Sequence, residues 1–341
     1  MDLPMTDQRS ASSVLGTVLL VAVVVVIATV AFVGALAVLD GFGTPTADGS
    51  FEFEQSSAGL VVRPTALGTD VVVELNGREV EQINSDEAGK PVLVPTAPGD
   101  TVTIVSTDGE QSVLVSREID DRSDIGDFIA YYPFEDSGQT LTDRSGNGND
   151  ATLNGDEDGD GWTGDGYEFT GDDYFEVTDL NTPVSEVSEF TFAVAYETDT
   201  GTEKQELAEH ISGDDNWGVE IKECGPDCDT NTDDTYSPNF FVDEAGGSQT
   251  GQIFGGEQQT GQSKVIVGTY DGSSTEMYVD GDLKSTGSFE SEISMGDFYI
   301  GTDAENPGNS DNLDGRIYEI RLYYTAFDDS EIRRITSVMT P

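Results

Sequence analysis

The sequence predicts a mainly β protein in which one apolar N-terminal α-helix precedes two antiparallel β domains. The stretch Ser10–Leu39 contains no charged residue and is dominated by valine, alanine and leucine. Short β-branched runs separated by turn residues follow it, which is typical of β-sandwiches. Near residue 126 the composition changes to glycine, asparagine, aspartate and aromatic residues, which indicates a new domain. We therefore expect a leader at 1–9, a hydrophobic helix at 10–40, a small β-sandwich at 50–119 and a larger sandwich at 126–338.

The charge of the chain excludes one class of partner. Its 341 residues include 67 Asp and Glu against 15 Lys and Arg, for a net charge of −52. The acids are spread along the whole polar part and are not gathered in a tail. A surface of this charge repels nucleic acid, so no nucleic-acid partner is expected. Sparse lysine and dispersed acids resemble the proteins of extreme halophiles, in which salt screens such self-repulsion.

The apolar stretch is long enough to cross a membrane. As a helix, Val14–Leu39 rises roughly 39 Å, against a hydrocarbon core of about 30 Å. It is longer than the apolar part of a secretory signal peptide, and no small-residue cleavage site follows Leu39. A buried core helix would show a polar face, whereas this stretch is apolar all round. Because Arg9 precedes it and dense acids follow it, we expect a single-pass membrane protein with its C-terminal part extracellular.

The residues around the start of this helix resemble a known family. The stretch Asp7–Gly16 reads DQRSASSVLG and is similar to the beginning of archaeal type IV pilins, especially the haloarchaeal ones, with Ser13 and Leu15 where Pro and Ile are usual. The resemblance implies that a prepilin peptidase cuts between Arg9 and Ser10 and leaves the helix on the mature protein. It also implies that the helix packs with other pilin subunits in a surface filament.

Strand signals fill the segment 50–119. The β-branched run Asp70–Leu75 is followed by Asn76-Gly77, a strong hairpin turn, and further runs cover 91–94, 100–105 and 112–116. Short strands at this spacing predict a small β-sandwich, which pilins of this family also carry after their helix. The segment has no histidine, nucleophile or metal-ligand cluster, so we expect a structural role, as a filament sheath or a stalk.

Ordered motifs across residues 126–338 resemble laminin-G-like, concanavalin A-like domains. The likeness begins with the strand Phe128–Phe134 and the Asp-x-Ser-Gly-Asn-Gly-Asn loop at 143–149. It continues through strands at 190–196 and 264–279 and ends with the closing strand 314–323, after which 327–332 reads as a short capped helix. The resemblance implies an antiparallel β-sandwich of jelly-roll type.

The loop at 143–149 is a candidate calcium site. It offers side-chain oxygens and glycine-exposed carbonyls, and Ca²⁺ takes six to eight oxygen ligands from flexible loops. In related domains such a loop and an acid on the closing strand often hold a structural Ca²⁺. The resemblance implies Asp143, Asn147, Asn149 and Glu319 as the ligands here. The alternative is that the same residues only make a tight turn.

Loops at the edge of the sandwich are the expected binding region. The candidates for contact with an extracellular glycan or protein ligand are Trp162, His210, Asn216 and Trp217. The alternative for Trp217 is a core position on a strand, because Val219 and Ile221 flank it at alternate positions. The two cysteines, Cys224 and Cys228, would close a short disulfide in an oxidising exterior or stay as free thiols.

The sequence shows no recognisable set of catalytic residues, and we expect that the protein is not an enzyme. Glucanases with this sandwich usually carry closely spaced Glu-x-Asp-x-x-Glu on one strand, and no expected strand has that pattern. The sequence thus favours a pilin-like cell-surface protein, a minor or tip subunit, that displays a laminin-G-like domain for adhesion. One alternative is a single-pass, membrane-anchored carbohydrate-binding protein that does not polymerise, and another is a surface glycan hydrolase.

Overall fold

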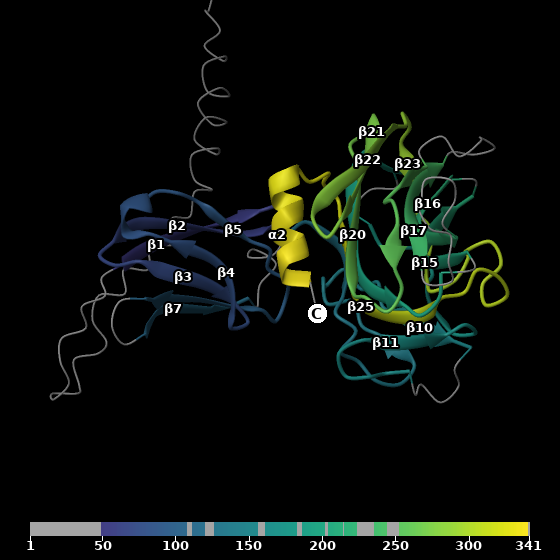
Figure 1. The fold of residues 1–341 in the computed structure, drawn as a ribbon, viewed down its shortest axis with the longest axis horizontal. Helices are drawn as coiled ribbons and strands as arrows, with labels where there is room; N and C mark the ends of the chain where they lie inside the picture. Colours follow the sequence, from purple (N-terminus) through teal and green to yellow (C-terminus); the bar gives the residue numbers. More distant parts are fainter. Residues whose placement is uncertain are drawn as a thin grey trace, which may run out of the picture. The chain divides into compact units, whose positions relative to one another are not determined.

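The computed structural model describes residues 49–107, 111–119, 126–155, 161–182, 186–201, 204–213, 215–223, 235–243 and 252–339. The expected leader at 1–9 and hydrophobic helix at 10–40 lie outside these residues. Residues 47–341 form one compact unit (Figure 1). No helix within the described ranges is long and apolar enough to cross a membrane.

The first part of this unit is built from two small sheets. A three-stranded sheet has the order β1-β2-β5, and a four-stranded sheet has the order β4-β3-β6-β7. The guanidinium of Arg117 on β7 lies 5.2 Å from the ring centre of Phe53 on β1, so the two sheets meet face to face. Between β3 and β4, Asn76 and Gly77 both take positive φ, as a type I′ turn requires. The elements are β1 (Gly49–Ser56), β2 (Gly59–Leu67), β3 (Val71–Leu75), β4 (Arg78–Ile83), the 3₁₀ turn η1 (Ser85–Glu87), β5 (Val92–Val94), β6 (Thr101–Ser106) and β7 (Ser112–Glu118).

The second part is a larger sandwich of two antiparallel sheets. A nine-stranded sheet runs β18-β17-β16-β15-β24-β12-β10-β9 with β19 beside β17, and a seven-stranded sheet runs β11-β25-β14-β20-β21-β22 with β8 beside β25. The strands are β8 (Phe128–Tyr132), β9 (Thr140–Leu141), β10 (Ala151–Asn154), β11 (Tyr167–Thr170), β12 (Tyr174–Val177), β13 (Glu186–Val187), β14 (Phe190–Thr198), β15 (Gln205–Ser212), β16 (Asp215–Glu223), β17 (Thr235–Asp243), β18 (Ile253–Phe254), β19 (Gln258–Gln259), β20 (Lys264–Tyr270), β21 (Ser274–Val279), β22 (Asp282–Ser288), β23 (Ile293–Ser294), β24 (Asp297–Ile300) and β25 (Asp314–Tyr323).

Aromatic side chains fill the space between these two sheets. Phe190 and Phe192 on β14 face Trp217 on β16, with ring centres 4.8 and 5.6 Å apart, and all three are fully buried. Such offset aromatic pairs each add stability beyond the area they bury. The mainly β prediction and the antiparallel sandwich are therefore confirmed.

The chain ends in helix α2 (Asp329–Met339), which begins where the sequence predicts a capped helix but runs further. Asp328 caps it, because its Oδ1 accepts hydrogen bonds from the backbone N–H groups of Ser330 and Glu331. The helix contacts β20 on one side and β4 and β5 on the other (Figure 1). Its buried residues Ile332, Ile335 and Met339 belong to one apolar cluster with residues of both sandwiches.

Two arginines strengthen the contact between the first sandwich and the larger sandwich with its helix α2. Arg321, which is buried on β25, pairs with Glu319 and donates from Nη1 to the backbone oxygen of Pro95, at 3.1 Å. Arg334 on α2 pairs with Glu81 and donates to the backbone oxygen of Val80, at 3.0 Å. The two segments predicted as separate β domains therefore share one apolar cluster, and the larger sandwich has a second cluster of its own.

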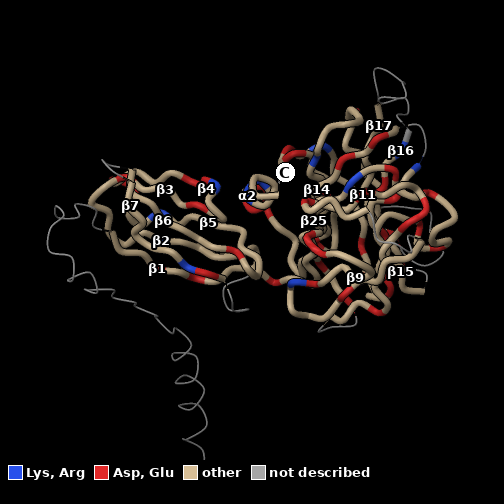
Figure 2. Tube along the Cα trace, turned by 90° about the horizontal axis from the view of Figure 1, so that it is seen from below, with Lys and Arg blue, Asp and Glu red and all other residues tan. Residues whose placement is uncertain are grey.

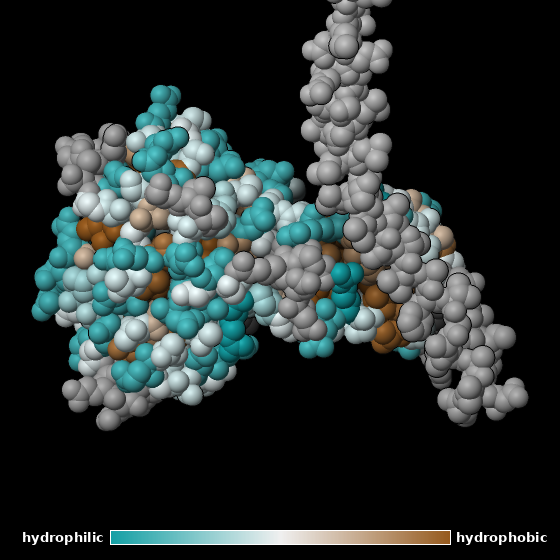
Figure 3. Space-filling view, turned by 180° about the vertical axis from the view of Figure 1, so that it is seen from behind, coloured by the Kyte–Doolittle hydropathy of each residue, from teal (hydrophilic) through white to brown (hydrophobic). Residues whose placement is uncertain are grey.

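Acidic residues occur along both sandwiches, with few basic ones among them (Figure 2). Hydrophilic residues cover most of the described surface seen in Figure 3, and hydrophobic ones show in smaller areas between them. The acids are thus distributed over the fold, as the sequence indicates.

Candidate functional site

A polar cavity of about 580 Å³ opens where three loops of the larger sandwich meet. The loops are those between β11 and β12, between β14 and β15, and between β24 and β25. This is a size at which protein pockets commonly hold small ligands. Every lining residue is polar or glycine: Thr170, Gly171, Thr200, Lys204, Gln205, Asn309, Ser310, Asp311, Asn312 and Asp314.

Side-chain amides hold the walls of this cavity, here called the Lys204 pocket, in place. Gln205 Oε1 accepts the backbone N–H of Asp314 at 2.8 Å, and its Nε2 donates to the backbone oxygen of Thr200 at 2.9 Å. Asn312 Nδ2 donates to the backbone oxygen of Gly171 at 2.7 Å. The bonds of Gln205 to Asp314 and of Asn312 to Gly171 each tie one loop to another, and the bond of Gln205 to Thr200 braces the β14–β15 loop itself, so the walls are fixed within the protein.

Lys204 links the pocket to buried carboxyl groups. Its Nζ lies 2.7 Å from Glu206, 2.9 Å from Asp311 and 3.2 Å from Glu220. Burial by itself would lower the pKa of Lys204, but these three carboxyl groups outweigh it, and the net effect raises that pKa. The ammonium group therefore stays charged and holds together residues from β15, β16 and the β24–β25 loop.

Glu206 and Glu220 face each other across the β15–β16 pair, and both are only 1% exposed. Burial raises the pKa of Glu206 well above its usual range, and the charge of Glu220 raises it further. Burial also acts on Glu220, but Lys222 and Lys204 outweigh it and lower the pKa of that carboxyl. The two carboxyls therefore differ in what controls them: burial dominates at Glu206, and the neighbouring lysines dominate at Glu220.

Two acceptors in this cluster lack a protein partner. Glu206 Oε2 and Asn239 Oδ1 make no hydrogen bond with any part of the chain that the structure describes, although both atoms are buried. Asn239 uses its Nδ2 to donate to Glu220. Buried polar atoms of this kind are usually satisfied by ordered water, so we expect water beneath the pocket.

The sequence analysis missed this cluster. The alternation Trp217, Val219, Ile221 was recognised, and it places Glu220 on the opposite face of the same strand. Glu206 could not be assigned to that face, because a bulge between Glu206 and Ala208 shifts the register of β15. The two carboxyls therefore come together across strands and not along one strand.

The predicted calcium loop is closed by hydrogen bonds within the protein. Asp143 Oδ1 accepts the backbone N–H groups of Tyr131 and Ser145, and its Oδ2 accepts the backbone N–H of Asn149 and the hydroxyl of Ser145. Asn147 Nδ2 donates to the backbone of β8 at 2.7 Å. The loop therefore makes the tight turn that was the alternative interpretation.

These residues do not fit a calcium ion as the structure arranges them. Asn149 Oδ1 accepts the backbone N–H of Asn181 at 2.6 Å, and Glu319 is paired with Arg321. In the described ranges, no group of three or more His, Cys, Asp or Glu side chains is arranged to hold a metal. Calcium binding stays a prediction, and it would require Asp143 to give up hydrogen bonds.

The predicted ligand residues are mostly part of the core. Trp217 is fully buried, as the alternative interpretation expects. His210 is also fully buried and stacks on Trp217 with ring centres 5.4 Å apart. Asn216 is half-buried, and its Nδ2 donates to Glu209 at 3.4 Å. None of the three lines the Lys204 pocket.

Trp162 packs against the core as well. Its Nε1 donates to the backbone oxygen of Gly138 at 2.8 Å, and its ring meets those of Tyr167 and Phe175 edge to face. The structure thus uses this tryptophan to close one end of the sandwich. The processing residues Arg9 and Ser10 and the cysteines Cys224 and Cys228 lie outside the described residues.

Comparison with known proteins places the larger sandwich in a fold family. Residues 169–333 match the family model of the concanavalin A-like lectin/glucanases superfamily. This segment is therefore a laminin-G-like, concanavalin A-like domain. The matched range begins at β11, so the resemblance of 126–168 rests on the motifs alone. None of the curated proteins compared matches the sequence.

Solved structures resemble this chain at low identity. Domain 4 of AbnA, a GH43 extracellular arabinanase from Geobacillus stearothermophilus in complex with arabinotriose, is 19% identical with a TM-score of 0.46, and the match covers 61% of this chain and 98% of that one. The receptor-binding domain of a botulinum neurotoxin mosaic serotype C/D is 13% identical with a TM-score of 0.45, over 62% of this chain and 51% of that one. The botulinum neurotoxin DC binding domain in complex with rat synaptotagmin II is 12% identical with a TM-score of 0.44, over 63% of this chain and 52% of that one. The chain spans about half the length of the neurotoxin domains, and these likenesses concern the fold alone.

Proposed function

We propose that the concanavalin A-like domain binds an extracellular carbohydrate in the Lys204 pocket. The observation that carries the proposal is a cavity of about 580 Å³ whose lining consists of amide, hydroxyl and charged groups on a lectin/glucanase-like sandwich. Saccharides present many hydroxyl groups that both donate and accept hydrogen bonds, so a lining of this kind suits them. Hydrogen bonds from the side-chain amides of Gln205 and Asn312 fix the walls of the pocket. The pocket therefore needs little ordering when a ligand binds.

A glycan array probed with the full chain in detergent tests this proposal. Ser310→Trp would fill the Lys204 pocket, and we expect it to reduce binding to the preferred saccharide by tenfold or more, a loss of about 1.4 kcal/mol or more. Ser337→Trp, which adds the same bulk at a different surface cavity, is the matched control and should bind neutral saccharides as the parent does. Equal binding by the parent and Ser310→Trp, or no binding to any saccharide, would overturn the proposal.

The domain would be displayed outside the cell by the N-terminal segment. The pilin-like stretch Asp7–Gly16 supports a minor or tip subunit of a type IV pilus-like filament, processed between Arg9 and Ser10. Mass spectrometry of the mature protein should then find an N-terminus at Ser10. An N-terminus at Met1 would favour the alternative of a membrane-anchored carbohydrate-binding protein that does not polymerise.

A binding role is preferred to glycan hydrolysis. A glycosidase needs two carboxyl groups that reach the scissile bond, at least about 5 Å apart. Glu206 and Glu220 are 1% exposed, and Lys204 contacts both of them. If polysaccharide were cleaved and Glu220→Gln abolished the cleavage, the hydrolase alternative would replace the binding role.

A further inference from the structure

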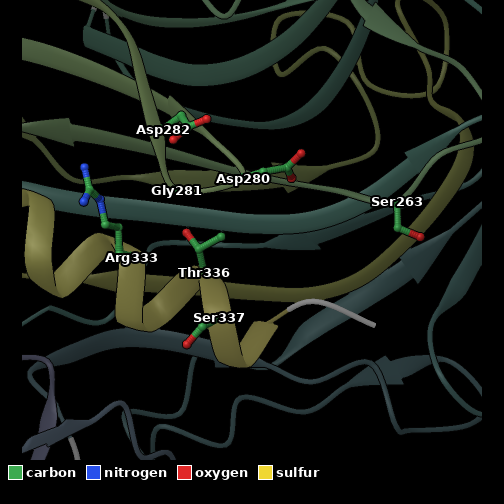
Figure 4. Close-up of a pocket in the computed structure, with 7 residues that line it drawn as sticks. All are labelled: Ser263, Asp280, Gly281, Asp282, Arg333, Thr336 and Ser337. Carbon is green, nitrogen blue, oxygen red and sulfur yellow. The ribbon is translucent and has the colours of Figure 1, made fainter. Parts of the chain in front are cut away.

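A second polar cavity lies between the C-terminal helix and the β21–β22 turn. Its volume is about 570 Å³, and Figure 4 shows the side chains that line it: Ser263, Asp280, Gly281, Asp282, Arg333, Thr336 and Ser337. Asp280 and Gly281 both take positive φ in the turn, which brings the backbone close to the helix. A Cβ at Gly281 would lie 3.6 Å from Cγ of Arg333. The turn and the helix thus form two walls of one site.

Arg333 is unusual among the described basic residues because the structure gives it no acidic partner there. Of the lysines and arginines in the described ranges, it is the one for which the structure gives no ion pair, hydrogen bond or ring contact. The sequence has 67 acidic residues and 15 Lys and Arg, so acids are not scarce. Its neighbour Arg334 on the same helix pairs with Glu81.

The two carboxylates of the cavity are already balanced by lysines. Asp280 Oδ2 lies 2.9 Å from Nζ of Lys264, and its Oδ1 accepts the backbone N–H of Val265 at 3.0 Å. Asp282 lies 3.5 Å from Nζ of Lys284. Arg333 is therefore the surplus positive charge of this site, and its side chain extends from α2 toward the turn (Figure 4).

From this charge balance we infer that the cavity binds a carboxylate group of an acidic saccharide or small acid, with Arg333 as its counter-ion. A guanidinium presents paired N–H donors that match a carboxylate in a bidentate contact. Ser263 and Ser337 line the same cavity, with the Ser263 hydroxyl donating to Glu197 at 3.3 Å and the Ser337 hydroxyl to the backbone oxygen of Arg334 at 2.7 Å. The cavity has room for a monosaccharide ring. This inference does not depend on the proposed function, because the Lys204 pocket shares no residue with this site.

The test compares D-glucuronate with D-glucose, which has a hydroxymethyl group in place of the carboxylate, by saturation-transfer NMR with the full chain in detergent. Salt of about 1 M shortens the Debye length to about 3 Å and removes the long-range repulsion of a chain with a net charge of −52. Glucuronate should bind saturably, and glucose at least tenfold more weakly. Acetate distinguishes the two classes of ligand, a small acid and an acidic saccharide. Acetate binding as tight as glucuronate binding indicates a site for small acids, and weaker acetate binding indicates a saccharide site.

Substitutions inside and outside this cavity test whether glucuronate binds in it. Arg333→Ala should weaken glucuronate binding about tenfold, because a charge-assisted contact is lost. Ser337→Trp should block it, whereas Ser310→Trp in the Lys204 pocket and Arg63→Ala, which removes the same charge elsewhere, should not. Asp282→Asn should strengthen it, since Lys284 is then released. Equal responses to glucose and glucuronate, unchanged binding by Arg333→Ala, or no saturable response would overturn the inference.

Discussion

Glu209 is a buried carboxyl whose titration should be visible in stability. It lies on β15, and its Oε2 accepts the backbone N–H of Ala304 at 2.8 Å. Burial is the main cause that raises its pKa from 4.5 to about 7. The folded state therefore binds this proton more tightly than the unfolded state. This contribution to stability is fully present below pH 4.5 and is lost as the pH rises through 7.

Glu209→Gln should stabilise the fold at pH 8 and change little at pH 4.5, since glutamine keeps an acceptor for Ala304 without a charge. The expected gain at pH 8 is about 3 kcal/mol in the free energy of unfolding. Urea denaturation at both pH values, in the same salt, measures it. Glu54→Gln, at a largely exposed position, is the control. A gain of equal size at both pH values would contradict the assignment.

The contribution of His210 to stability should have the opposite pH dependence. Burial lowers its pKa from 6.5 to about 3, and its Nε2 accepts the backbone N–H of Gly296 at 2.6 Å. The ring is neutral in the folded state, so its contribution is present above pH 6.5 and is lost as the pH falls toward 3. As the chain has a single histidine, one imidazole Hε1 signal reports on it. That signal should not shift between pH 8 and pH 5, and a midpoint near 6.5 would show that the ring is exposed.

Helix α2 contacts both sandwiches, and Arg334 tests its role. The side chain pairs with Glu81, and both are about a quarter exposed. Arg334→Ala should lower the free energy of unfolding by about 1–2 kcal/mol, because a partly covered ion pair and a hydrogen bond are lost. Arg333→Ala, one position away and without a partner, should change it by less than about 0.5 kcal/mol. Equal losses in urea denaturation would show that the pair adds nothing.

Local sequence signals predicted individual turns and helix ends well. They could not predict which residues meet across strands that are far apart in the sequence. Asn76-Gly77 specifies its turn by backbone conformation alone, and Asp328 with Glu331 marks the start of α2. Trp217 was a candidate ligand residue, and its alternating neighbours gave the alternative of a core position, which is where the structure places it. The Glu206–Glu220 pair depends on strand register across a bulge, and the shared core depends on α2 meeting β4. Such contacts are set by tertiary packing, which a local pattern does not contain.

At the scale of the whole molecule, the net charge of −52 should make stability depend on salt. Self-repulsion opposes the compact state, and screening weakens it as the Debye length falls from about 10 Å at 0.1 M to about 3 Å at 1 M. We expect the melting temperature by circular dichroism to rise with KCl over this range. Sodium sulfate at matched ionic strength separates screening from the stronger burial that sulfate promotes. A melting temperature unaffected by KCl would contradict the halophile interpretation.

The position of α2 at the end of the chain has a consequence for synthesis on the ribosome. The strands of 49–119 emerge first, yet the apolar cluster they belong to includes Ile332, Ile335 and Met339. These side chains are translated after every strand of the larger sandwich has been made. The first sandwich therefore waits, with part of its apolar face uncovered, while residues 120–328 are translated. A chain that stops before residue 329 would keep all its strands and still lack the segment that completes their shared core.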